Sequence, residues 1–499
     1  MIARPIWAGA ACLTGAALAF TLFGAFSGPF SLQEFCTRNR PTWVLGLFTT
    51  PRYTAVTGPA FLGVLSALSG LYLLALWLAP RVSGRPVWTV LLGGLPIVFV
   101  AVLLPGYPLL SNDIFKYVFD GRILAVYQEN PFLRVPADYP DDRFYDLVYW
   151  KAVVNAHGPI WRVLEAVSAL AGGEQCASAI LAMKVWPAAA YFGTIGALFL
   201  VLRDACPDRA LTGTLAYAWC PLVLLEALQN GHNDVVAALP VLLAVWAARS
   251  ERWRLAIVLV AVGFLVKPLA ALAGPILLVA AWRDGPAARR EVSLGAGMAA
   301  ALVVACYAPF FVGLQTFQGM ERSGIFSASP GELVVLGLEA AGWPLDRAMT
   351  VARIMANGGF LLMAAVATWA LWRGHLPLPA ALTTAFFGYL LLGSQWFNPW
   401  YLLWLVPVSV LAPTWRLRTL VLAFAVLAPL TYLLQYDARL VVPLVFLPVA
   451  ALAVLWRAEL GWSRTAVPDA VHGPSAPAPA TVARPKMAGH GPRHGPRHG

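Results

Sequence analysis

The chain has 499 residues, of which 60% are hydrophobic and only 12% are charged, and its mean hydropathy is +0.70. A soluble domain carries about 25% charged residues, so this composition excludes a soluble protein, which could not cover so much apolar surface. The net charge of +11 does not indicate nucleic-acid binding, because the basic residues stand in short clusters between apolar runs. The sequence therefore predicts an all-α, polytopic integral membrane protein whose surroundings are lipid.

Apolar runs long enough for a bilayer-spanning helix recur along the whole chain. A span needs about 20 apolar residues, or fewer where the helix is short or broken. The first run follows Arg4 and could be a signal peptide, but its length favours a retained helix. We predict about 14 spans, at residues 6–27, 58–79, 87–106, 179–201, 210–228, 234–248, 254–266, 268–282, 291–312, 347–372, 377–394, 399–413, 418–435 and 439–456.

Clusters of arginine between these runs predict the orientation, because cytoplasmic loops are rich in Arg and Lys. With both termini in the cytoplasm, clusters such as Arg283–Arg290 fall inside the cell. This topology keeps residues 107–178 outside, with 158–171 as an interfacial helix that carries Arg162 and Glu165. It also divides residues 254–282 into two short helices, broken near Lys267-Pro268, because proline removes a backbone donor.

The expected location is the cell membrane, and the chain divides by these runs. The Pro-, Ala- and Gly-rich C-terminal stretch cannot build a core and is predicted to be disordered. The predicted parts are N-terminal transmembrane helices (1–106), an outer loop with interfacial helices (107–178), central transmembrane helices (179–312), a second outer loop (313–346), C-terminal transmembrane helices (347–460) and a cytoplasmic tail (461–499).

The six cysteines have no metal-ligand spacing. Cys36 and Cys176 could both face an oxidising compartment and pair with each other. The alternative is that all the cysteines are free thiols.

The densest polar stretch is residues 111–136, directly after the third predicted span. Asp113 and Tyr117 are four positions apart and would share one face of a helix on the outer surface. A carboxylate there, shielded from bulk water, can act as a general base. The alternative is that Asp113 only caps this helix, because Ser-Asn-Asp is a favourable start for a helix.

Two further clusters lie at predicted outer ends of spans. Residues 228–240 include His232, Asn233 and Asp234 where the chain enters lipid, although a turn between helices often contains such residues. Lys267 is a lone lysine among apolar residues, and a phosphate is a natural partner for a cation in that position. The alternative is that Lys267 extends to the lipid headgroups.

The last cluster is the aromatic stretch 394–407, which contains Trp400 and Tyr401. Alone, it could be an interfacial aromatic belt. All four clusters nevertheless fall on the same predicted face. A cation suits a phosphate, amides and carboxylates suit hydroxyls, and aromatic rings suit a sugar, so together they predict a site for a sugar phosphate beside lipid. An ion-coupled transporter would instead place its charges in the middle of spans.

These motifs resemble those of GT-C glycosyltransferases that use polyprenyl-phosphate sugars, and most closely bacterial polyprenol-phosphate-mannose-dependent mannosyltransferases. The likeness runs from about residue 107 to 410. His157 departs from it, since many relatives have Tyr before Gly-Pro, and this departure leaves the acceptor open. The likeness is carried by Asp113, Tyr117, Gly121-Arg122, Asn130-Pro131-Phe132, His157-Gly158-Pro159, Gly231-His232-Asn233-Asp234, Gly263–Pro268 and Gln395 with Pro399-Trp400-Tyr401.

The resemblance implies an inverting hexosyltransferase, with mannose as the expected sugar, acting on the outer membrane face. Asp113 would accept a proton from a hydroxyl of a glycan or glycolipid acceptor. Lys267, with Arg122 or His232, would hold the charge of the departing polyprenyl phosphate. No cofactor or metal is expected, although Asp113 with Asp234 could in principle hold one. The implied substrate-binding residues are Tyr117, Arg122, Asn130, His157, His232, Asn233, Asp234, Lys267, Gln395, Trp400 and Tyr401.

Three alternatives to this interpretation remain at the level of sequence. A flippase for lipid-linked glycans would need a polar path through the bilayer, and the spans carry almost no charges away from their outer ends. An O-antigen-ligase-like transferase would depend on Arg and His residues of a large late outer loop, and residues 313–346 are a modest one. A purely structural membrane protein would leave the clustering on one face unexplained.

Overall fold

The computed structural model describes residues 3–27, 30–38, 57–154, 156–320, 325–456 and 499. Across these ranges the chain is helical, with isolated β-bridges where extended segments meet. The predicted all-α fold is confirmed. The tail predicted at 461–499 lies outside the described residues except for Gly499, and so do Glu321 and Arg322 of the second predicted outer loop.

Helices follow one another along the chain, and a longer segment with two 3-10 turns connects α6 to α7. The α-helices are α1 (Ala3–Phe26), α2 (Leu32–Arg38), α3 (Thr57–Leu78), α4 (Arg85–Thr89), α5 (Leu95–Leu103), α6 (Asp113–Ala125), α7 (Pro159–Gly172), α8 (Cys176–Ala205), α9 (Ala210–Ala218), α10 (Pro221–Val223), α11 (Asp234–Arg249), α12 (Trp253–Val266), α13 (Ala273–Asp284), α14 (Pro286–Tyr307), α15 (Pro330–Ala340), α16 (Leu345–Trp372), α17 (Leu378–Gly388), α18 (Leu402–Val410), α19 (Trp415–Leu427), α20 (Leu430–Leu433), α21 (Ala438–Val441) and α22 (Leu447–Leu455). Wider π-helical turns extend several of them, at Val90–Gly94, Leu224–Gln229, Tyr389–Gly393 and Val442–Phe446.

Among the described residues, 8 helical stretches are long and apolar enough to cross a membrane, or up to 9 if Pro207–Ala218 and Pro221–Gln229 form one bent span. A polytopic membrane protein is therefore confirmed, whereas the count of about 14 spans stays a prediction. Part of the difference comes from the short apolar helices Trp253–Val266, Leu378–Gly393 and Pro399–Val410, which are below the length of a full span.

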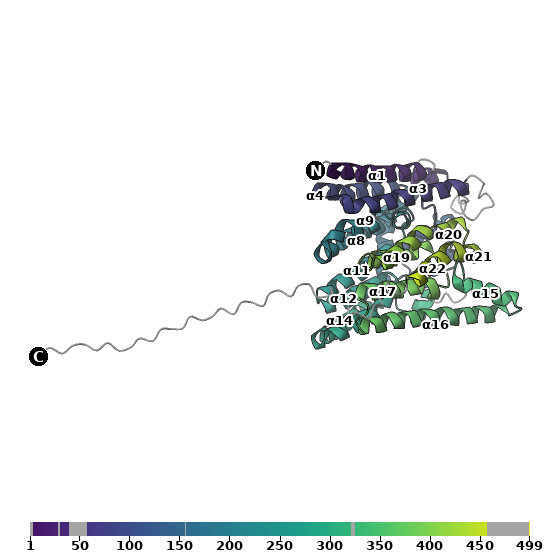
Figure 1. Cartoon of the computed structure of the whole chain (residues 1–499). Helices are drawn as coiled ribbons and strands as arrows, with labels where there is room; N and C mark the ends of the chain where they lie inside the picture. Colours follow the sequence, from purple (N-terminus) through teal and green to yellow (C-terminus); the bar gives the residue numbers. More distant parts are fainter. Residues whose placement is uncertain (1–2, 28–29, 39–56, 155, 321–324, 457–498) are drawn as a thin grey trace.

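The long helices run roughly parallel, with α1 and α3 at one edge of the bundle and α14 and α16 at the opposite edge (Figure 1). Most residues of α9, α11 and α18 are buried, and none of them is exposed. The edge helices expose large apolar side chains, for example Phe20 of α1 and Leu362 of α16, which are 77% and 67% exposed. Such side chains suit contact with lipid, because the hydrocarbon core contains no water and apolar surface is not costly there.

The predicted break at Lys267-Pro268 is confirmed. Helix α12 ends at Val266, Lys267 is extended (φ −147°, ψ 123°), and a 3-10 turn from Pro268 to Leu272 leads into α13. The backbone therefore leaves the helix at Lys267, and the side chain of this residue lines the pocket described below.

Helix α7 is a separate helix where the sequence predicted an interfacial one, but its charges do not face the interface. Arg162 and Glu165 are fully buried, and Arg162 contacts Asp120 of α6 and Glu165 at 2.6 and 2.9 Å. Lys116 also pairs with Asp120. The exposed face of α7 is apolar instead, because this buried ion network pairs its charges with α6.

A disulfide joins α2 to the start of α8. Cys36 and Cys176 are bonded, with their Cα atoms 5.7 Å apart across a sequence separation of 140. This finding decides between the two interpretations of the cysteines: Cys36 and Cys176 pair, and Cys12, Cys206, Cys220 and Cys306 are free thiols.

Candidate functional site

A pocket of about 270 Å³ opens where four distant parts of the chain meet. These parts are the start of α6, the segment before α7, the break after α12, and the segment between α17 and α18. The lining residues are Asp113, Trp150, Ala156, His157, Lys267, Pro268, Leu269, Tyr389, Trp396, Asn398, Trp400, Tyr401 and Trp404.

Asp113 is the first residue of α6, and its side chain is 27% exposed in this pocket. Asn112 occupies the N-cap position, and the Ser111 hydroxyl accepts a hydrogen bond from the Asp113 backbone N–H at 3.3 Å. Asp113 is therefore not the cap of the helix. Its side chain lines the pocket at the N-terminal end of this helix.

Buried polar side chains hold the loop that leads to Asp113. Lys184 of α8 is fully buried and donates to the carbonyls of Leu103, Leu104 and Gly106. A buried ammonium is costly unless its hydrogen bonds are made, so these carbonyls fix the end of α5 against α8. Gln229 donates to the Tyr107 carbonyl at 3.0 Å, and Asn230 accepts from the Leu110 N–H at 3.1 Å. Two polar residues of the 228–240 cluster therefore support this loop.

His232 lies directly behind Asp113. Its ring is buried and stacks on Trp400, with centroids 4.1 Å apart and an interplanar angle of 16°. Its Nδ1 is 3.9 Å from Asp113 Oδ2, and its Nε2 is 3.4 Å from Oε2 of Glu226. The preceding Gly231 has φ +75°, and a Cβ there would lie 2.7 Å from Ile114. A glycine is needed for this turn because of both the φ angle and the close approach of α6.

Lys267 and Asp234 form the principal ion pair of the site. Lys267 Nζ is 2.7 and 2.8 Å from the two carboxylate oxygens of Asp234, and 3.5 Å from Asn233 Oδ1. Asp234 is fully buried at the start of α11, whereas the Lys267 side chain keeps 16% of its surface exposed and lines the pocket. The carboxylate thus orients the ammonium from behind, and its open side faces the pocket.

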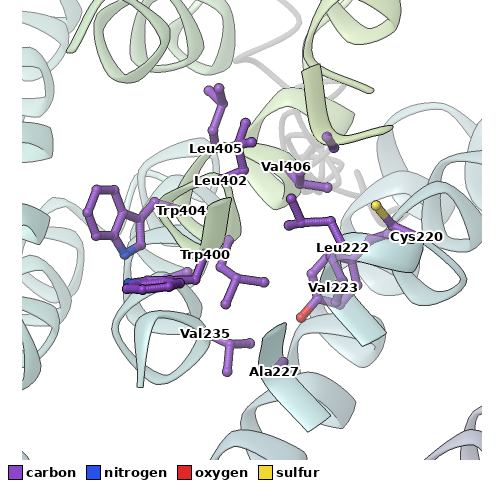
Figure 2. Packing of buried hydrophobic residues seen from close by; sticks show 14 of the residues in the cluster. Cys220, Leu222, Val223, Ala227, Val235, Trp400, Leu402, Trp404, Leu405 and Val406 are labelled. Atoms are coloured by element: carbon purple, nitrogen blue, oxygen red, sulfur yellow. The ribbon is translucent and has the colours of Figure 1, made fainter. Parts of the chain in front are cut away.

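Aromatic rings form one wall of the pocket, next to Lys267. The Tyr401 and Trp404 rings stack at 4.7 Å, and Lys267 Nζ lies 5.5 and 5.4 Å from their centroids. Figure 2 shows the Trp400 and Trp404 rings on the same side of this segment, while Leu402 and Val406 pack into the buried cluster that also contains Leu222 and Val223. The apolar side chains anchor the segment, and the indoles therefore remain available to the pocket.

The segment before α7 supplies His157 and Trp150. His157 lines the pocket, and the Tyr117 ring packs against its edge at 5.2 Å. The N–H of Gly158 donates to the Val266 carbonyl at 3.1 Å, which ties this segment to the Lys267 break. Trp150 faces Trp396 across the pocket mouth, with ring centroids 5.6 Å apart. Tyr117 thus supports His157 from below without lining the pocket.

Seven of the implied residues do not line the pocket. Four of these contact residues that do line it, namely Tyr117, His232, Asn233 and Asp234. The other three make contacts elsewhere. Arg122 pairs with Asp142 and Glu174, and the Asn130 amide donates to the Phe310 carbonyl at 2.8 Å. Gln395 contributes its backbone carbonyl, which accepts from the Ser329 hydroxyl at 2.7 Å. In this structure all three hold loops in place.

Sequence reasoning missed several residues of the site. Trp150, Tyr389, Trp396, Asn398 and Trp404 line the pocket. Trp404 is four positions after Trp400 and could have been found from helical spacing. Two more ionisable residues, Glu226 and Lys184, stand within apolar runs, and an ionisable residue in such a run is a signal in its own right.

Comparison with known proteins gives one family match. A family model described as alpha-(1->6)-mannopyranosyltransferase, N-terminal domain, matches residues 13–283. The matched stretch contains Asp113, His232, Asp234 and Lys267, and it ends before the aromatic wall. No curated protein matches the chain.

Proposed function

Because the chain belongs to the alpha-(1->6)-mannopyranosyltransferase family, we propose that it transfers mannose from a polyprenyl-phosphate donor to a glycan or glycolipid acceptor. We further propose that the reaction takes place on the outer face of the cell membrane and inverts the anomeric centre. Family membership supports a mannosyltransferase over a flippase or a structural protein. The donor, the acceptor and the membrane face are our proposal.

One observation carries the proposal. A carboxylate, Asp113, and an ammonium, Lys267, line the same aromatic-walled pocket of about 270 Å³. Glycosyl transfer with inversion needs a base for the acceptor hydroxyl and positive charge for the departing phosphate, with the sugar held between them. The pocket contains both groups, and its indole and phenol rings suit the apolar face of a pyranose.

The proposed mechanism uses these groups in order. The acceptor hydroxyl gives its proton to Asp113 as its oxygen attacks the anomeric carbon. The bond from that carbon to the phosphate oxygen breaks, and the polyprenyl phosphate leaves with the electron pair. Lys267, held by Asp234, faces the charge that develops on the phosphate. Attack opposite to the leaving group converts a β-linked donor into an α-linked product.

The disulfide supports the outer face. Disulfide bonds persist in oxidising compartments and are rare in the cytosol. Cys176 begins α8, shortly after the His157 segment that lines the pocket. An oxidising environment at Cys176 would therefore extend to the pocket.

Transfer of labelled mannose by the purified full-length protein in lipid tests the proposal. Polyprenyl-phosphate mannose would be supplied with a panel of mannosylated acceptors. We expect the wild-type protein to transfer label and Asp113→Asn to lose about 10²- to 10⁴-fold in kcat, the usual contribution of a general base.

Asp141→Asn is the matched control, since Asp141 is an exposed residue of the same loop and should tolerate the change. Transfer from a nucleotide sugar but not from the polyprenyl donor would contradict the donor assignment. Equal rates for wild type and Asp113→Asn would exclude Asp113 as the base.

A further inference from the structure

Glu226 is a buried carboxyl group for which the proposed mechanism has no role. It lies on the π-helical turn Leu224–Gln229 and is fully buried. A carboxylate without a cation beside it is costly in such a place. Lys267, the cation of the site, is bonded to Asp234 instead.

Glu226 contacts two residues besides His232. Asn230 donates to its Oε2 at 2.8 Å, and the Tyr432 hydroxyl donates to its Oε1 at 2.7 Å. His232 Nε2 lies 3.4 Å from the same Oε2. A protonated Oε2 can accept from Asn230 through a lone pair and still donate its own hydrogen to the His232 ring.

His232 connects Glu226 to the proposed base. Both ring nitrogens are buried without a completed hydrogen bond, and Nδ1 points toward Asp113 at 3.9 Å. Stacking on Trp400 fixes the plane of the ring. Burial, together with the charge of Lys267, holds the pKa of His232 well below its ordinary value. The imidazole is therefore neutral and carries a single proton, on one nitrogen or the other.

We propose that Glu226 is a positioning residue that acts on Asp113 through His232. As a neutral acid, Glu226 donates to Nε2 and so places the histidine proton on Nδ1. The Nδ1–H then donates to Oδ2 of Asp113 and leaves the other carboxylate oxygen directed at the acceptor hydroxyl. The gap of 3.9 Å closes when substrate orders the partly exposed Asp113 side chain, because hydrogen bonds of catalytic groups tighten in the substrate complex. This inference rests on the proposed function of Asp113.

Glu226 would do more than fill space, because the tautomer of His232 determines whether its ring attracts or repels the Asp113 carboxylate. With the proton on Nε2, the Nδ1 lone pair would face the carboxylate and repel it. With the proton on Nδ1, the ring donates a hydrogen bond to the ionised base, and such charge-assisted bonds are stronger than neutral ones.

Two substitutions of Glu226 test whether its carboxyl group acts as a hydrogen-bond donor or only fills space in the core. Glu226→Leu removes the donor, and we expect kcat to fall about 10-fold or more with little change in KM. Glu226→Gln keeps a donor toward His232 but loses the lone pair that accepts from Asn230, so we expect it to restore part of the kcat lost in Glu226→Leu. If Glu226→Gln is as slow as Glu226→Leu, a donor at this position does not support the reaction and the proposal is wrong.

Tyr432→Phe is the matched structural comparator, since it removes a hydrogen bond to the other oxygen of the same carboxyl group. We expect a change in kcat of only a few-fold. If Tyr432→Phe lowers kcat as much as Glu226→Leu, the effect comes from packing of the carboxyl group, which overturns the proposal.

A spectroscopic measurement tests the inference without activity. Solid-state NMR of reconstituted protein with ¹⁵N,¹³C-labelled histidine distinguishes the two neutral tautomers, and a His232→Gln sample assigns the His232 signal. We expect the Nδ1–H tautomer in wild type and in Glu226→Gln, and loss of that preference in Glu226→Leu. An Nε2–H signal in wild type would overturn the inference even if mannosyl transfer is observed. The Nδ1–H signal in a protein that transfers no mannose would leave the geometry standing and the proposed function refuted.

Discussion

At the scale of single residues, the site depends on a cation that a buried carboxylate holds in place. Lys267 is partly exposed, and Asp234 behind it is fully buried. Removing one partner of such a pair leaves a buried charge without compensation, at a cost of about 3–5 kcal/mol. In the proposed mechanism, stability and catalysis would therefore depend on the same lysine for different reasons.

We therefore expect a second substitution to restore the stability of a Lys267 variant without restoring its activity. Lys267→Met should lower both the thermal stability and the transfer rate, the latter by about 10²- to 10³-fold, as for other groups that stabilise developing charge. The double variant Lys267→Met/Asp234→Asn should recover most of the melting temperature, because the buried charge is gone, but none of the rate. Melting curves and initial rates in the same lipid measure both effects. Recovery of the rate in the double variant would show that Lys267 does not act on the leaving phosphate.

Sequence patterns predicted which charged residues lie near the pocket better than which polar residues line it. Asp113, His232, Asp234 and Lys267 were expected together on one face, and the structure brings them together around the pocket. Polar residues that bind loop backbone, such as Asn130, look the same in sequence as residues that bind a ligand. Their separation depends on long-range contacts, which a single sequence does not contain.

At the scale of elements, α6 and α7 pack closely enough to require a glycine. A Cβ at Gly121 would lie 2.2 Å from the Glu165 backbone oxygen. Backbone atoms cannot move aside as a side-chain end can, so any side chain at this position separates the two helices. The separation would carry Asp113 and His157 apart, since the two residues lie at or just before the starts of these helices.

Gly121→Ala should destabilise the protein by about 1–3 kcal/mol, the usual cost of overpacking, and also reduce the transfer rate. Gly196→Ala is the matched control, because Gly196 is also within a helix but has nothing within 4 Å of the added methyl group. That variant should be neutral or slightly stabilising, since alanine favours a helix over glycine. Equal melting temperatures for the two variants would contradict the close packing of α6 on α7.

At the scale of the whole molecule, α8 is long enough to cross the membrane and extend beyond it. It has 30 residues, which corresponds to about 45 Å of helix at about 1.5 Å per residue, and a bilayer has a hydrocarbon core of about 30 Å. Cys176 begins the helix and Cys206 directly follows it. The two cysteines should therefore lie on opposite sides of the membrane.

Cysteine labelling in intact cells tests this orientation. A membrane-impermeant maleimide should label Cys36 and Cys176 only after treatment with an impermeant reductant, because the two are joined in a disulfide. Cys206 is a free thiol and should be labelled only after permeabilisation. A variant without Cys206 and a variant without both Cys36 and Cys176 identify the labelled sites. Labelling of Cys206 from outside would reverse the topology and move the pocket to the cytoplasmic face.

Composition was sufficient for the fold class, but not for the number of spans. The apolar content required lipid around the chain. The orientation that the arginine clusters predict stays a prediction. The count depends on helices such as α12, α17 and α18, which are shorter than a full span. Helices α17 and α18 are buried along most of their length, and hydropathy alone does not distinguish a short buried helix from a span.

The pocket draws its charges and its aromatic wall from different parts of the chain. The acid, the lysine and the histidine lie within residues 13–283, whereas Tyr389, Trp400, Tyr401 and Trp404 come from later helices. A truncated protein ending at residue 283 would keep its ionisable groups and lose one side of the cavity, so the N-terminal segment is not an autonomous catalytic module. Chimeras that exchange only residues 389–398 between relatives offer the opposite experiment. They would vary Tyr389, Trp396 and Asn398 of the pocket while keeping Trp400, which stacks on His232.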